Sequence, residues 1–174
     1  MPIIELDDPG DQRVANYQGV RDPELVRRGD IFIAEGRQIV SELLTAQRFP
    51  VQSVLVTKTA RHALADALSA HPQLPVYVVP PQLVHEIAGF HIHQGCLAIG
   101  SREVGASWQE IATTTSRLLV LEGVGNPDNV GGIFRNARAF SAGGVLLGPG
   151  CADPLYRKAI RTSMGATLDM PLRT

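Results

Sequence analysis

The sequence predicts an α/β fold in which short strands alternate with amphipathic helices. Apolar runs the length of a buried strand recur along the chain, and Ile31-Phe32-Ile33-Ala34 is the first of them. A helical segment follows that run, because Ile39, Val40, Leu43 and Leu44 recur at helical spacing on one face. Repetition of this pattern is typical of a mostly parallel sheet with helices packed on it.

The first series of elements extends to about residue 100. Its strands are expected at 31–34, 51–56, 75–79 and 96–99. Its helices are expected at 37–47, in the segment that follows 57–59, and at 83–87. Residues 101–116 lose strand character and are rich in serine and threonine, so they are interpreted as a linker with one short helix at 108–112.

A second series begins after this linker. Its strands are expected at 118–121, at 145–147 and near 167, and its helices at 130–140 and 154–163. The predicted organisation is therefore one domain over residues 1–100, the linker over 101–116 and a further α/β segment over 117–174.

Composition excludes several classes of protein. The 174 residues carry 16 Lys and Arg against 17 Asp and Glu, which is unlike a highly charged disordered tail. Two cysteines, Cys96 and Cys151, are too few for a disulfide framework or a zinc site. The N-terminal residues lack the layout of a signal peptide, and no apolar run approaches the roughly 18 residues of a membrane span. We therefore expect a cytoplasmic protein.

Charge is unevenly distributed along the chain. Residues 1–129 carry 10 basic and 15 acidic side chains, whereas residues 130–174 carry six basic and two acidic ones. The near-neutral total therefore conceals a basic C-terminal segment, which could face an anion such as a phosphate backbone. Arginine outnumbers lysine 14 to 2 over the whole chain, so only clustered arginines count as evidence for such a surface.

The loop at 122–129 and the helix after it carry the most specific motif. No Gly-Lys-Ser/Thr follows, and the G-x-G-x-x-G spacing is absent, so neither common nucleotide-binding loop is present. Asn129 is placed to cap the helix, and Arg135 and Arg138 follow on neighbouring faces. Two interpretations stay open: a capped helix with two solvated arginines, or a helix N-terminus and an arginine that converge on an anionic substrate.

The sequence resembles a known family at this motif. Asn126-Pro127-Asp128-Asn129-Val130-Gly131-Gly132-Ile133-Phe134-Arg135-Asn136-Ala137-Arg138-Ala139-Phe140 is similar to the first signature motif of the SpoU/TrmH RNA 2′-O-ribose methyltransferases of the SPOUT superfamily. The segment 148–166, which ends in Arg161-Thr162-Ser163-Met164-Gly165-Ala166, resembles the central segment of that family. Phe32-Ile33-Ala34-Glu35-Gly36 and His93-Gln94-Gly95 are similar to landmarks of its N-terminal RNA-binding domain, an L30e/L7Ae-like α/β sandwich.

The resemblance implies methyl transfer from S-adenosylmethionine to a ribose 2′-hydroxyl of RNA, and this RNA is expected to be ribosomal. It also implies a homodimer, with no metal and no membrane involved. Arg135 would be the catalytic arginine, which orients the 2′-hydroxyl and the adjacent phosphate, and Asn129 would hold the loop and the ribose or the arginine in place. His91 and His93 lack companions at metal-ligand spacing and are interpreted as loop or RNA-facing residues. The residues expected to contact RNA are Arg138, Arg161, Ser163, Arg37 and Arg28.

The family pattern continues beyond the motifs found here, with a Glu-containing glycine-rich motif and a Ser-Leu-Asn motif that form a trefoil knot. This sequence stops at Pro171-Leu172-Arg173-Thr174, before either motif. The expectation is an RNA-binding domain joined to the first half of a SPOUT domain without its knot, and cofactor-binding residues are left unassigned. Three hypotheses follow: a methyltransferase, possible only with the remaining segment, an RNA-binding module without catalysis, and an α/β domain with a protein partner.

Overall fold

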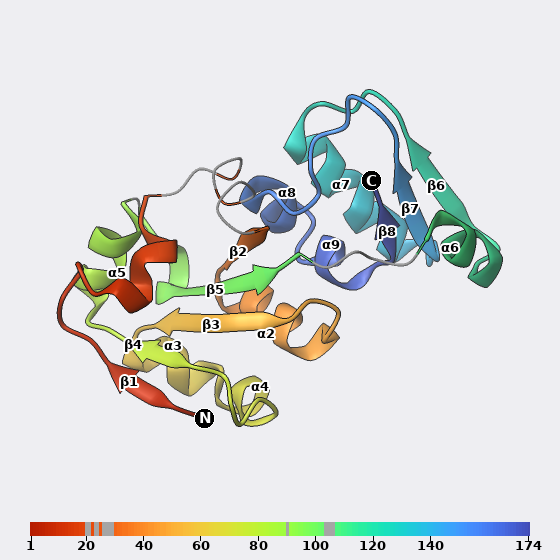
Figure 1. Cartoon of the computed structure of the whole chain (residues 1–174). Helices are drawn as coiled ribbons and strands as arrows, with labels where there is room; N and C mark the ends of the chain where they lie inside the picture. Colours follow the sequence, from red (N-terminus) through yellow and green to blue (C-terminus); the bar gives the residue numbers. More distant parts are fainter. Residues whose placement is uncertain (20–21, 23–24, 26–29, 90, 103–106) are drawn as a thin grey trace. The chain divides into compact units, whose positions relative to one another are not determined.

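The computed structural model describes residues 1–19, 22, 25, 30–89, 91–102 and 107–174. The chain divides into two compact units, Met1–Arg102 and Glu103–Thr174 (Figure 1). Each unit is an α/β structure with its own sheet and its own hydrophobic core.

Unit 1 is built on a five-stranded sheet. Its strands are β1 (Ile3–Glu5), β2 (Ile31–Glu35), β3 (Val51–Val56), β4 (Val76–Val78) and β5 (Cys96–Ser101). They lie in the order β1-β4-β3-β5-β2. β1, β3 and β4 pair in parallel, but β5 is antiparallel to both of its neighbours, so the sheet is mixed where the sequence predicts a mostly parallel one.

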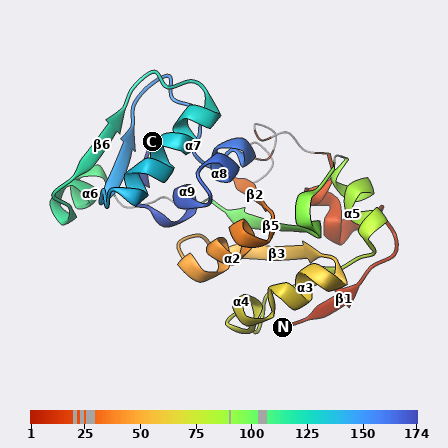
Figure 2. The same ribbon diagram turned by 180° about the vertical axis from the view of Figure 1, so that it is seen from behind.

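Helices cover both faces of this sheet. They are η1 (Gln12–Tyr17), α2 (Arg37–Ala46), α3 (Lys58–Ala63), α4 (Ala65–Ser69), α5 (Pro81–Ala88) and the short η2 (His93–Gly95). α2, α3 and α4 lie on one face and α5 on the other, as the two opposite views show (Figures 1 and 2). η1 packs on α5, and the buried side chains of both share one core cluster with the sheet.

The direction of β5 depends on the edge of the sheet to which the chain returns after α5. α5 has eight residues and a loop follows it, which returns the chain to the edge of the sheet where β4 ends. β5 therefore starts at that edge and runs opposite to β3 and β4. The alternating side chains of β5 face two cores, and Gly100 lies opposite Phe32, whose ring would be 2.3 Å from a Cβ at that position.

Unit 2 has a three-stranded parallel sheet, β6 (Leu118–Leu121), β7 (Gly144–Leu147) and β8 (Leu172–Arg173), in that order. Its helices are α6 (Trp108–Thr114), α7 (Pro127–Ala139), α8 (Arg157–Thr162) and α9 (Ala166–Asp169). The strand expected near 167 is wrong: that segment is α9, and the third strand is β8. Gly165, with φ 83°, starts α9, and the Thr167 N–H donates to the Ser163 hydroxyl, so local bonds favour a helical turn there.

α6 lies within the segment interpreted as a linker, and it belongs to unit 2. Ser107 caps this helix, because its hydroxyl accepts from the Glu110 N–H while the Glu110 carboxylate accepts from the Ser107 N–H. Ile111 is buried and lies beside Gly144 of β7. None of the described helices is long and apolar enough to cross a membrane.

Candidate active site

The carboxyl edge of the unit 2 sheet carries the signature motif. The loop after β6 and the loop after β7 are joined by three backbone hydrogen bonds. Gly148 N–H donates to Leu121 O at 2.7 Å, Gly123 N–H to Pro149 O at 3.0 Å, and Ala152 N–H to Val124 O at 2.8 Å. These bonds fix both loops beside the end of β7, where ligands of parallel α/β sheets bind.

A cavity of about 620 Å³ lies at this edge. Residues from both loops and the last residue of the sequence line it, among them Gly125, Gly148, Tyr156 and Thr174. Its volume is within the roughly 300–1,000 Å³ of small-molecule sites. Gly150 has a left-handed φ of 76°, and its Cβ would be 3.3 Å from Gly123 Cα, so glycine allows the two loops to approach.

The N-terminus of α7 differs from the prediction. Asn126 is the N-cap, and its side chain accepts from the Asp128 N–H at 2.8 Å, with Pro127 as the first helical residue. The prediction that Asn129 caps this helix is therefore wrong, because Asn129 is the third helical residue. Its side chain is exposed one turn into the helix, which leaves the amide available to a ligand.

Asp128 links the start of α7 to α8, a role that the sequence analysis missed. Its carboxylate accepts from the Lys158 ammonium at 2.7 Å and from the Thr162 hydroxyl at 3.0 Å. The hydrogen bond from Lys158 and, to a smaller extent, the one from Thr162 lower the pKa of the Asp128 carboxyl, because both favour its charged form. The spacing of a helix-starting Asn-Pro-Asp could have indicated the cap, but nothing local indicated the partners on α8.

Arg135 lies on the exposed surface of α7, one turn after Gly131. α7 and α8 approach each other closely at Gly131, where a Cβ would be 2.5 Å from Ala159 O. Within the described residues, no hydrogen bond or ion pair holds the Arg135 guanidinium. An exposed guanidinium at this place can bind an anion without first breaking an internal pair.

The other residues predicted to contact RNA from unit 2 have different environments. Arg138 is half-buried, and its guanidinium nitrogen lies 3.9 Å from a carboxylate oxygen of Asp169. Arg161 is exposed at the end of α8. Ser163 is 1% exposed, and its hydroxyl donates to Ile160 O at 2.9 Å. This burial favours a structural role for Ser163 at the junction of α8 and α9 over a direct contact with RNA.

The two landmark motifs of unit 1 meet in space. Arg37 is the first residue of α2 and is exposed, and its N–H donates to the Gln94 side-chain oxygen at 2.8 Å. Gly36 N–H donates to Cys96 O at 3.1 Å and Thr57 N–H to Gly95 O at 2.9 Å. Arg28, the remaining predicted RNA contact, lies outside the described residues.

Gln94 caps α2 from a distant segment, because the Gly36 N-cap has no side chain to do so. Gln94→Ala is expected to lower the free energy of unfolding of the protein by about 1 kcal/mol, as other lost N-caps do. Urea denaturation measures this change. The adjacent exposed variant Gln38→Ala should stay within about 0.5 kcal/mol of wild type, and equal losses for the two variants would contradict the capping role.

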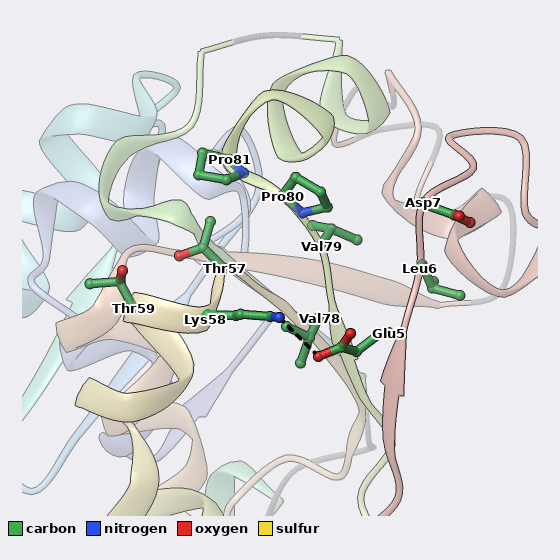
Figure 3. A pocket seen from close by; sticks show the side chains of 10 residues that line it. All are labelled: Glu5, Leu6, Asp7, Thr57, Lys58, Thr59, Val78, Val79, Pro80 and Pro81. Atoms are coloured by element: carbon green, nitrogen blue, oxygen red, sulfur yellow. Dashed lines mark ion pairs between the residues drawn. The ribbon is translucent and has the colours of Figure 1, made fainter.

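A second hollow, of about 570 Å³, lies at the carboxyl ends of β1, β3 and β4 (Figure 3). Lys58 and Glu5 lie on its walls with the ammonium and carboxylate 3.2 Å apart, and Asp7 also lines it (Figure 3). Two carboxylates and one ammonium do not favour a phosphate backbone. The surface around Arg37 is therefore the better candidate RNA interface of unit 1.

Both units of the chain are similar to domains of known RNA methyltransferases. Residues 33–102 match the model for RNA 2′-O ribose methyltransferase substrate binding, and residues 116–174 match the SpoU rRNA methylase family. The crystal structure of an AdoMet-bound rRNA methyltransferase from Sinorhizobium meliloti aligns with a TM-score of 0.79 at 21% identity, over 98% of this chain and 64% of that one. The fold is that of the rRNA methyltransferases. Both units therefore match domains of SpoU-type RNA methyltransferases, which confirms the resemblance.

Curated relatives agree with this assignment. An uncharacterized tRNA/rRNA methyltransferase of Mycobacterium tuberculosis is 35% identical over 175 residues, which cover 98% of this chain and 60% of the relative. A 23S rRNA guanosine 2′-O-methyltransferase of Bacillus subtilis is 22% identical over 168 residues, which cover 97% of this chain and 64% of the relative. The chain thus spans about three-fifths of the length of these relatives.

Proposed function

We propose that the protein is an RNA 2′-O-ribose methyltransferase that uses S-adenosylmethionine and acts on ribosomal RNA. The single observation that carries this proposal is the exposed Arg135 on the helix that leaves the paired loops at the carboxyl edge of the sheet. The family, the names of the relatives and the AdoMet-bound structural neighbour support it.

The cavity at this edge fits part of the cofactor. Its volume suits a nucleoside-sized group, and the glycine-rich backbone of residues 148–152 lines it together with the Tyr156 side chain. We assign residues 148–152 and Tyr156 as groups that would hold the cofactor. When bound, S-adenosylmethionine supplies a methyl group on a sulfonium sulfur.

Arg135 acts by position and charge in this proposal. A guanidinium has a pKa above 12 and is a poor base, so it orients the ribose 2′-hydroxyl and the adjacent phosphate through its planar fork of donors. Arg135 would hold the 2′-hydroxyl beside a phosphate or water that can take its proton, so that the oxygen could receive the methyl group that the cofactor would supply. Asn129, exposed at the start of the same helix, holds the ribose or the loop.

Unit 1 serves as the RNA-binding part in this proposal, with an L30e/L7Ae-like fold, and residues 117–174 form the first part of a SPOUT domain. Arg37 at the start of α2, Arg138 and Arg161 supply cations for the phosphate backbone. We further propose a homodimer. Phe140, the C-cap of α7, is 72% exposed and lines a hollow together with Leu119 and Ile133, and a second copy would cover this apolar surface.

An RNA-binding module without catalysis is the competing function, and one experiment separates the two. The full-length protein is incubated with ribosomal RNA and methyl-labelled S-adenosylmethionine, and the RNA is then hydrolysed in alkali. A 2′-O-methylated ribose lacks the hydroxyl that alkali needs, so label in resistant dinucleotides is the expected result. RNA binding without label would favour the module, and loss of both binding and label would overturn both proposals.

A further inference from the structure

We infer that His91 is a stacking platform for an unpaired RNA base. This inference rests on the proposed function, since it names the part of the RNA that unit 1 recognises. The evidence is the stacking of the exposed His91 ring on His85 of α5, in a loop whose residue Gln94 is hydrogen-bonded to the start of α2.

The rings of His85 and His91 stack with their centroids 4.6 Å apart and their planes inclined by 23°. His85 belongs to α5 and is half-buried, whereas His91 lies on the following loop and is exposed. The Ile92 N–H donates to His85 Nδ1 at 3.0 Å, so Nδ1 is the unprotonated nitrogen and the ring is held in place. His85 thus supports one face of the exposed His91 ring.

The loop around this pair is fixed at several points. Gln94 is bonded to the Arg37 N–H, and the Gly95 and Cys96 carbonyls accept from Thr57 and Gly36. The backbone of Gln94 has a left-handed φ of 64°, which is uncommon for a residue other than glycine and is held here by the surrounding bonds. A ligand that stacks on His91 would therefore pay little to order the loop.

The arrangement suits a single-stranded or looped-out nucleotide. Unpaired bases stack on aromatic side chains, histidine included, while cations contact the neighbouring phosphates. Arg37 supplies such a cation. It lies at the start of the helix that Gln94 caps, and Gln94 follows His91 by three residues along the chain. The chemistry selects an exposed base and disfavours a continuous duplex, whose bases are already stacked on one another.

The test measures the affinity of the full-length protein for two fluorescent RNA hairpins, one with a seven-nucleotide adenosine loop and one with abasic sites in that loop. His91→Ala is expected to weaken binding of the adenosine-loop hairpin about fivefold or more, the loss of one base–aromatic stack. It should leave binding of the abasic hairpin unchanged, and His91→Phe should restore the wild-type affinity. His62→Ala, an exposed histidine on α3, is the matched control and should change neither affinity.

The outcomes separate this inference from the proposed function. Equal affinity of wild type and His91→Ala for the adenosine-loop hairpin would overturn the platform and leave RNA binding intact. A similar loss with both hairpins would also overturn it, because the effect would then not depend on a base. If wild type bound neither hairpin nor ribosomal RNA at low salt, the proposed function itself would fail.

Discussion

Arg135→Ala in the full-length protein is expected to lower kcat for methyl transfer about 100- to 1,000-fold, as the loss of one aligned donor does in other enzymes. The side chain is exposed and holds no partner within the described part of the chain, so its removal should leave the fold unchanged. Initial rates with labelled cofactor and ribosomal RNA measure the effect, and thermal unfolding checks the fold.

Arg135→Lys tests how the side chain acts. Lysine keeps the positive charge but loses the planar pair of donors that binds hydroxyl and phosphate together, so it should recover only part of the lost rate. Arg61→Ala on α3 is the matched control and should retain wild-type kcat. Full activity of Arg135→Lys would contradict the orienting role, because charge alone would then be sufficient.

Local patterns were enough to place most strands and helices, but not the pairing of distant segments. The strands at 31–35, 51–56 and 118–121 follow from apolar runs bounded by turns. β1 was not predicted, because Ile3–Glu5 is short and becomes a strand only through its parallel pairing with β4, more than 70 residues away. The antiparallel direction of β5 likewise depends on where the chain returns after α5.

Local sequence patterns likewise predicted some features of the candidate site but not others. Its position after β6 and the exposure of Arg135 follow from a strand–loop–helix pattern. The N-cap of α7 was predicted at Asn129, three residues too late. Proline is favoured at the first helical position, so Pro127 indicates that the preceding residue, Asn126, is the cap. The bonds from Asp128 to Lys158 and Thr162 join segments 30 or more residues apart, so no local spacing could have indicated them.

Gly131→Ala is expected to destabilise unit 2, because a group forced into a packed interface costs about 1–3 kcal/mol. The new Cβ would lie 2.5 Å from Ala159 O and 2.9 Å from Thr162 Cβ, both on α8. A backbone carbonyl cannot rotate away as a flexible side chain can, so α8 itself must shift. This loss outweighs the roughly 1 kcal/mol by which alanine exceeds glycine in helix propensity.

Gly132→Ala is the matched control, because the same change occurs one residue later on the same helix. A Cβ at Gly132 meets no atom within 4 Å, so only the helix propensity changes and the protein should gain about 0.5–1 kcal/mol. Urea denaturation of the two variants should therefore give shifts of opposite sign. Stabilisation of both variants would contradict the close contact between α7 and α8. That contact allows Asp128 of α7, the helix that carries Arg135, to bond Lys158 and Thr162 of α8.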